Sequence, residues 1–234
     1  MKLFKFLCGL VVAVLLLLVI LVVVFLLSYN SILRAMMEHQ IRAQTGMEAE
    51  IGKLNFALMA PTLDIENFKI HNPPEFGGTP FLDIPEIHVE YDRPALSRGE
   101  IHITLLRFNL GELDIVKNQA GRTNIFSLGV PLPTKKSTGS STTLADFKKQ
   151  TGLDFKGIDV LNVSIGKFKY IDLQAPKNNR EQTVGIENCL MKNVKSPADF
   201  AGLAALIALR SGDFFGALVG PQQSGLNFLK QFGQ

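Results

Sequence analysis

The feature that most constrains the fold of this chain is an alternation of apolar and polar residues with a period of two. Such a period is typical of β-strands, which place successive side chains on opposite faces. From residue 47 onward the pattern recurs in short runs; for example, Ile87, Val89 and Tyr91 alternate with His88 and Glu90. Prolines and glycines separate the runs. We therefore expect a mainly β body of about ten half-buried, mainly antiparallel strands with one apolar face.

The alternation changes phase within one run. Apolar residues occupy odd positions up to Ile65 and even positions from Phe68, with Asn67 between them. A β-bulge produces such a change, so we predict a bulge at Asn67. The pattern I-E-N-x-x-[IM]-x-N occurs at 65–72 and again at 186–193, which suggests that one strand unit is used twice in the sheet.

An uncharged apolar run extends from Phe6 to Leu27. At about 1.5 Å per residue, a helix of this length spans roughly 33 Å, which matches a hydrocarbon core of roughly 30 Å. A cleaved signal peptide is the competing interpretation, but the run is long and no small-x-small site follows it. The sequence therefore favours a retained transmembrane signal anchor, whose anchoring residues include Phe6, Leu10, Leu15, Val19, Val23 and Leu27.

The charges that flank the apolar run bear on its orientation. Lys2 and Lys5 precede the run, whereas Arg34 and Arg42 follow it together with Glu38. The positive-inside rule then gives a slight preference for a cytoplasmic N-terminus. The body of the protein is accordingly expected on the extracytoplasmic side.

Composition and periodicity divide the chain into six segments. The prolines and the Ser/Thr/Gly cluster at 130–143 are typical of a flexible linker. Ser196 and Asp199 form a capping box at the start of a helix. The predicted segments are the anchor (1–28), a juxtamembrane helix (29–46), a β region (47–129), a flexible linker (130–143), a second β region of the same sheet (144–195) and apolar C-terminal helices (196–234).

Motifs for catalysis are absent from the sequence. It contains no HExxH and no GxSxG, and Leu161 stands where a phosphate-binding loop would need its first glycine. His71, His88 and His102 fall on the polar side of the alternation, so we expect them to face solvent rather than to converge on a metal. No enzymatic activity, cofactor or metal is therefore predicted.

Charge argues against a nucleic-acid-binding protein, and cysteine content argues against a disulfide-stabilised one. The net charge is only +3 and no basic stripe is present, so a nucleic-acid partner is not indicated. Cys8 lies in the apolar run and Cys189 lies far downstream, so no disulfide between them is expected.

A sheet with one apolar face must cover that face. The helices predicted at 29–45 and 197–209 can close a core over it, and general physical reasoning favours this arrangement. Alternatively, the sheet curls and leaves an apolar groove, which suits acyl chains. The alternation does not separate the two arrangements.

Several degenerate motifs follow the apolar run in a fixed order. They are Thr45-Gly46, APTLDIENFKIHNP at 60–73, IHVEYD at 87–92, LSRG at 96–99, Ile101 with Leu105, LDIVKN at 113–118 and GRTN at 121–124. Their order and spacing resemble the N-terminal region of bacterial AsmA-like proteins, a family related in fold to chorein-type bridge-like lipid transfer proteins. The resemblance covers residues 1–125, and more loosely 155–195.

The resemblance implies an elongated, curved, antiparallel sheet that forms a taco-like groove. It also implies a single-pass inner-membrane protein with a cytoplasmic N-terminus and a periplasmic body. Its role would be lipid transport or outer-membrane biogenesis, with membrane lipids as partners together with an envelope protein partner or self-assembly. The predicted groove lining is Ile51, Phe56, Leu63, Ile65, Ile87, Val89, Tyr91, Ile101, Ile103, Leu105, Leu113, Ile115, Val160 and Phe168.

One departure from the family is the size of the chain. About ten strands at a spacing of about 4.8 Å give a sheet only about 50 Å long, too short to bridge two membranes by itself. The function predicted from the sequence is therefore binding of lipid acyl chains or assistance in their transfer. The alternative is a closed-core periplasmic scaffold that recruits an envelope protein partner.

Overall fold

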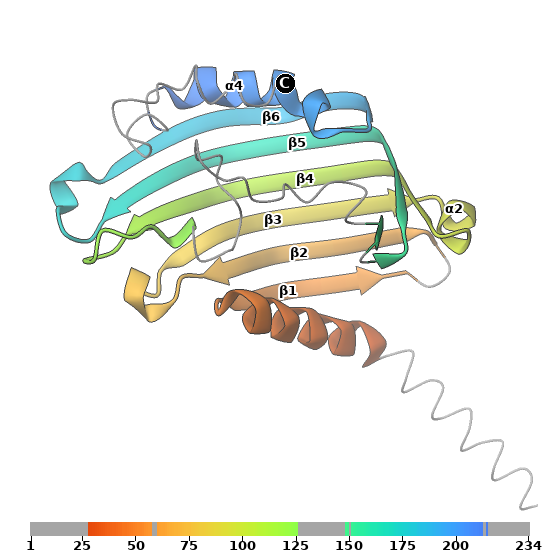
Figure 1. Cartoon of the computed structure of the whole chain (residues 1–234), viewed down its shortest axis with the longest axis horizontal. Helices are drawn as coiled ribbons and strands as arrows, with labels where there is room; N and C mark the ends of the chain where they lie inside the picture. The colour runs from red at the N-terminus through yellow and green to blue at the C-terminus, as the bar shows by residue number, and fades with distance from the viewer. Residues whose placement is uncertain (1–27, 58–59, 126–147, 150, 213, 215–234) are drawn as a thin grey trace, which may run out of the picture.

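The computed structural model describes residues 28–57, 60–125, 148–149, 151–212 and 214. Its main body is one open sheet of six strands in the order β1-β2-β3-β4-β5-β6 (Figure 1). The strands are β1 (Glu48–Phe56), β2 (Thr62–His71), β3 (Pro80–Tyr91), β4 (Glu100–Lys117), β5 (Asp154–Asp172) and β6 (Arg180–Val194). Every neighbouring pair is antiparallel except β4 and β5, which are parallel.

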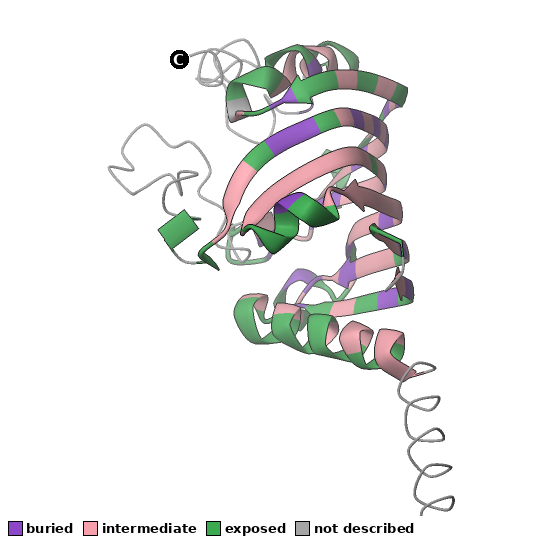
Figure 2. Cartoon of the chain, turned by 90° about the vertical axis from the view of Figure 1, so that its right-hand side faces the viewer, coloured by how far each residue is buried: buried purple, intermediate pink, exposed green. Residues whose placement is uncertain are grey.

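Helices lie along both edges of the sheet. A helix over residues 28–45 lies alongside β1, and α4 (Ala201–Ser211) lies alongside β6 (Figure 1). The sheet is curved, and both helices lie on its concave side (Figure 2). The shorter helices are α2 (Arg93–Ser97), η1 (Pro74–Phe76), η3 (Pro176–Asn178) and η4 (Pro197–Phe200).

The fold class predicted from the sequence needs correction in its strands. About ten short antiparallel strands were expected, but six long strands form a mixed sheet. The number differs because Pro85, Gly111 and Gly166 lie inside strands rather than between them. The parallel pair arises because residues 118–153 return the chain to the end of the sheet at which β4 begins, and a parallel pair requires such a long connection.

The transmembrane part of the predicted fold class, and the inner-membrane localisation that rested on it, are also corrected. Within the residues that the structure describes, no helix is both long enough and apolar enough to cross a membrane. The helix over 28–45 carries Arg34, Glu38 and Arg42, and α4 has only 11 residues. The predicted anchor spans residues 1–28, and all of it except residue 28 lies outside the described residues, including Phe6, Leu10, Leu15, Val19, Val23 and Leu27.

All six strands change the phase of their alternation in the same part of the sheet. Each strand carries two apolar residues three positions apart that both belong to the core, whereas strict alternation would place them on opposite faces. These pairs are Ile51 and Leu54, Ile65 and Phe68, Ile84 and Ile87, Leu110 and Leu113, Ile165 and Phe168, and Ile186 and Cys189. The phase change keeps the apolar side chains on one face along the full length of the strands.

One residue between the two members of the pair on each of β1 to β5 lies in a row across the sheet, which we call the kink row: Gly52, Asn67, Pro85, Gly111 and Gly166. The row is tightly packed. A Cβ atom on Gly166 would lie 2.3 Å from the carbonyl oxygen of Gly111, and one on Gly52 would lie 2.9 Å from the Cβ of Asn67. Glycine is therefore required at these positions by the close approach of neighbouring strands.

Asn67 has a left-handed backbone conformation with φ of 54°. The register on either side of it is unbroken, since Glu66 pairs with Glu86 and Phe68 pairs with Ile84. The bulge predicted at Asn67 is therefore wrong: a left-handed residue, not an inserted one, reverses the faces. Asn188 has a φ of 50°, so the two I-E-N motifs both place their asparagine in this conformation. Asparagine tolerates it better than most residues.

The free edge of β1 is capped by side chains of the helix over 28–45. Glu38 accepts from the N–H of Ile51 at 2.8 Å, and Asn30 accepts from the N–H of Phe56 at 3.0 Å. Arg34 donates to the carbonyl oxygen of Gly52, and the Tyr29 hydroxyl donates to that of Phe56. These bonds occupy backbone groups that an edge strand otherwise offers to another chain.

Candidate functional site

The concave side of the sheet is apolar across all six strands. We define the concave apolar face by the strand residues named below, which belong to the hydrophobic clusters except for Val89, which pairs with Leu63, and Tyr91, which stacks on Phe56. It comprises Ile51, Leu54, Phe56, Leu63, Ile65, Phe68, Ile70, Leu82, Ile84, Ile87, Val89, Tyr91, Ile103, Leu106, Phe108, Leu110, Leu113, Ile115, Ile158, Leu161, Val163, Ile165, Phe168, Tyr170, Val184, Ile186, Cys189 and Met191. None of these residues carries a charge.

Burial varies along this face. Towards β5 and β6 it is covered by α4, whose Leu203 joins the core, and Leu161 is only 2% exposed. Across β2 and β3, in contrast, Leu63, Ile87 and Val89 are only half-buried. The concave apolar face is thus packed as a core near α4 and left partly accessible over β2 and β3.

Two aromatic rings border the accessible part. Phe56 of β1 and Tyr91 of β3 stack with ring centroids 6.4 Å apart and planes only 2° from parallel. Both side chains are half-buried. Aromatic rings arranged in this way offer a flat apolar surface to a neighbouring hydrocarbon chain.

The structure brings most of the predicted groove residues to the concave apolar face. Ile51, Ile65, Ile115 and Phe168 are buried there. Half-buried on the same face are Phe56, Leu63, Ile87, Val89, Tyr91, Ile103 and Leu113. Ile101 is also half-buried and pairs with Phe155, at the start of β4. Their predicted role as a ligand-binding surface remains a prediction.

Leu105 and Val160 lie on the opposite, convex face. Leu105 pairs with Glu90 and with Val160, whereas the next residue, Leu106, belongs to the core. The register shifts here, because Glu90 pairs with Leu105 but Tyr91 pairs with Ile103. The extra residue reverses the alternation between Ile103 and Leu105, so a strict period of two assigns Leu105 to the wrong face.

Several residues of the concave apolar face were not predicted. Leu54, Phe68, Leu106, Phe108 and Leu161 all pack against the clusters. For Leu54 and Phe68 the signal is the pair of apolar residues three positions apart at the kink row, which the sequence displays in both strands.

No family model, curated protein or solved structure matches this chain. The resemblance of residues 1–125 to AsmA-like proteins therefore remains a prediction, and the site is assigned from its own geometry.

Apart from Leu105 and Val160, the convex face is mainly polar, and it carries ion pairs between neighbouring strands. Arg107 of β4 donates to Glu86 of β3 at 2.9 Å, and Lys53 of β1 lies 2.7 Å from Glu66 of β2. Further pairs are Lys69 with Asp83, Lys167 with Glu112 and Glu181, Lys169 with Glu112, and Lys117 with Asp172. Within the described ranges no cluster of His, Cys, Asp or Glu is arranged to hold a metal ion.

Two buried aspartates on this side differ in their partners. The carboxylate of Asp172 accepts from the backbone N–H groups of Ala175 and Gln174 and lies 3.3 Å from Lys117. Burial alone would raise the pKa of Asp172, but these donors hold it below its usual value. Asp114 is 4% exposed and its Oδ1 atom has no hydrogen-bond partner. Burial, and after it the charge of nearby Glu112, raises the pKa of Asp114 to about 7.

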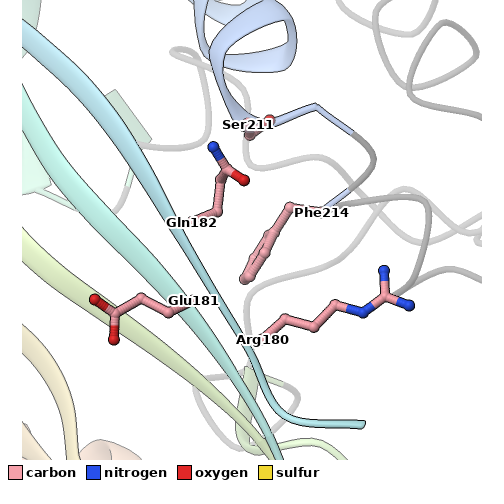
Figure 3. A pocket seen from close by; sticks show the side chains of 5 residues that line it. All are labelled: Arg180, Glu181, Gln182, Ser211 and Phe214. Atoms are coloured by element: carbon pink, nitrogen blue, oxygen red, sulfur yellow. The ribbon is translucent and has the colours of Figure 1, made fainter.

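A recess of about 310 Å³ lies beside the end of α4, where Ser211 and Phe214 face the start of β6 (Figure 3). Its wall combines Arg180, Glu181 and Gln182 with the ring of Phe214. Phe214 packs against Phe168, with ring centroids 5.8 Å apart. This recess offers a mixed polar wall rather than an apolar channel, so the concave apolar face is the stronger candidate site.

Proposed function

We propose that the concave apolar face binds acyl chains of lipids and that the protein is a non-enzymatic lipid-binding or lipid-transfer protein. The observation that carries the proposal is the kink row. Six strands change phase together, and the result is a long face without a charged side chain whose part over β2 and β3 is only half-buried. A core that needed only to be closed would not leave this part accessible.

The dimensions of the face suit an elongated apolar ligand. With 19 residues, β5 is about 60 Å long at about 3.3 Å per residue. Each Å² of apolar surface removed from water contributes roughly 25 cal/mol, so a chain laid along the strands gains affinity with its length. The concave apolar face offers no charged group to a lipid headgroup, so the headgroup would lie beyond the strand ends.

A second candidate function is a scaffold that recruits a protein partner. Apolar side chains exposed outside the concave apolar face favour it: Ile32 is 50% and Met36 is 62% exposed, on one side of the helix over 28–45. Leu190 and Leu209 are also exposed, near β6 and α4. Under this alternative the concave apolar face is only a core.

Charge substitutions on the two faces of neighbouring strands distinguish the candidates. Val89→Glu places a carboxylate on the half-buried concave apolar face, whereas Leu105→Glu, the matched control, places one on the convex face. Binding is measured by the fluorescence of diphenylhexatriene, an apolar probe without titratable groups, and folding by thermal unfolding followed by circular dichroism.

If acyl chains bind the concave apolar face, wild-type protein and Leu105→Glu bind the probe, and Val89→Glu stays folded but binds at least tenfold more weakly. If the face is a closed core, Val89→Glu unfolds because it buries an unpaired charge. Wild-type protein that binds no probe would refute the proposal directly.

A further inference from the structure

Two histidines on the convex face each lie between two carboxylates. Nδ1 of His88 is 2.5 Å from Asp64 of β2, and its Nε2 is 3.2 Å from Glu90 of β3. Nε2 of His102 is 2.9 Å from Asp159 of β5, and its Nδ1 is 3.6 Å from Asp92. The sequence predicted solvent-facing histidines, but the side chains of His88 and His102 are only 19% and 31% exposed.

The geometry has a consequence for the protonation of both rings. A neutral imidazole has one N–H donor and one lone pair, whereas an imidazolium has two donors. Carboxylate oxygens only accept, so a neutral ring in either position would point a lone pair at a carboxylate. A second proton therefore gives His88 a hydrogen bond to both of its carboxylates, and it gives His102 a hydrogen bond to Asp159 and an ion pair with Asp92 at 3.6 Å.

Charges on the neighbouring strands define the balance at each ring. Asp64 and, more weakly, Glu90 raise the pKa of His88, whereas burial and then the charge of Arg107 on β4 oppose the increase. Arg107 is itself engaged by Glu86 at 2.9 Å. Asp159 and, more weakly, Asp92 raise the pKa of His102.

The two histidines lie behind the accessible part of the concave apolar face. On β3, His88 stands between Ile87 and Val89, whose side chains point to the other side of the sheet. His102 likewise stands next to Ile103 on β4. His88 connects β3 to β2, and His102 connects β4 to β5. Through Asp92, the residue directly after β3, His102 also connects β4 to the end of β3.

We propose that His88 and His102 act as a proton-operated lock, which holds β2 to β5 in register at this end of the sheet when both rings are protonated. Loss of the protons removes one donor from each ring and loosens the strands that carry Leu63, Val89 and Tyr91. The lock itself is independent of any ligand. That it regulates acyl-chain binding rests on the function proposed above.

The sign of the effect follows from the direction of the pKa shifts. A histidine whose pKa is higher in the folded than in the unfolded state stabilises the fold below its unfolded pKa, near 6.5. This stabilisation disappears as the pH rises through the raised pKa of the folded state. The lock is therefore closed below about pH 6.5 and opens as the pH rises through the raised pKa of the folded state.

Nuclear magnetic resonance titration of the full chain tests the lock. His88→Gln and His102→Gln assign the two resonances, and His39→Gln, which changes an exposed residue of the helix over 28–45, is the matched control. We expect both rings to titrate above the ordinary value near 6.5. A midpoint at or below that value for either ring overturns the proposal.

Thermal unfolding between pH 5.5 and 8.5 supplies the second readout. The melting temperature of the wild type should fall more steeply with pH than that of the double variant, whereas His39→Gln should follow the wild type. Equal slopes in wild type and double variant would overturn the lock. Asp114 contributes to both slopes alike, so their difference belongs to the two histidines.

Probe binding separates the lock from the proposed function. If both proposals hold, the affinity of the wild type for diphenylhexatriene falls several-fold from pH 6 to 8.5, and that of the double variant does not. Binding that does not change with pH refutes the regulatory role. Absence of binding at every pH refutes the proposed function, while the titration and unfolding results still decide the lock.

Discussion

Asp114→Asn should stabilise the protein at neutral and alkaline pH. Asp114 is buried, its Oδ1 has no partner, and its pKa is raised from 3.8 to about 7 by burial first and by Glu112 second. A carboxyl with a raised pKa favours folding when protonated, so its contribution is present below about pH 4 and is lost as the pH rises to about 7. Asparagine keeps the shape of the side chain and removes this loss.

The size of the effect follows from the two pKa values. The difference between 3.8 and about 7, at about 1.4 kcal/mol per pH unit, corresponds to about 4 kcal/mol. Lys169, which bonds Glu112 at 2.6 Å and weakly opposes the shift at Asp114, is left in place by the substitution. For a chain of this size, a gain of that order raises the melting temperature by about 10 °C.

Urea unfolding of wild type and Asp114→Asn from pH 5 to 8.5 measures the difference. It should grow with pH up to about 7 and then level off. Asp172→Asn is the matched control on the neighbouring strand: its carboxylate accepts from two backbone N–H groups, so the variant should lose roughly 1–3 kcal/mol at pH 7. If Asp114→Asn is as destabilising as Asp172→Asn at pH 8, the reasoning about Asp114 is refuted.

Two further predictions concern the kink row and the edge of β1. Gly166→Ala should destabilise the fold by more than about 3 kcal/mol in urea unfolding, because its Cβ would meet the Gly111 carbonyl oxygen at 2.3 Å. Gly202 has open space around it in α4, so Gly202→Ala should instead stabilise the fold slightly, by about 0.5–1 kcal/mol. Equal losses of stability in Gly166→Ala and Gly202→Ala would contradict the kink-row account. Glu38→Ala should free the N–H of Ile51 and promote self-association in light scattering. Glu38→Gln keeps an acceptor and should remain like the wild type; unchanged association of Glu38→Ala would show that the cap is dispensable.

The local pattern of the sequence predicts much of the fold. Runs such as 87–91 alternate strictly, and such runs lie in strands with their apolar residues on one face. The capping box at Ser196 and Asp199 also marks the start of a helical segment in the structure. These features depend on nearest neighbours along the chain, which the sequence displays directly.

The features that were missed depend on neighbours across the sheet. Gly111 and Gly166 resemble breaks in the sequence, but in the structure they allow two parallel strands to approach closely. The parallel pairing of β4 with β5 depends on the connection between them, which starts β5 at the same end of the sheet as β4. Leu105 was assigned to the wrong face because an extra residue in β4 is visible only in its register with β3.

Long-range pairing also decides the chemistry of the polar residues. The alternation within β3 predicts a solvent-facing His88, but in the folded structure Asp64 of the neighbouring β2 forms an ion pair with it. Asp114 alternates regularly in β4, and only the folded structure shows that its carboxyl is buried without a partner for Oδ1.

The measurement that tests the central claim most directly is mass spectrometry of lipids extracted from purified protein. The chain is purified as wild type, Val89→Glu and Leu105→Glu, and released lipids are quantified per mole of folded protein. Binding at the concave apolar face predicts acyl lipids with the wild type and Leu105→Glu, and a marked loss with Val89→Glu. Equal lipid content in all three folded proteins, or none in the wild type, would contradict the claim.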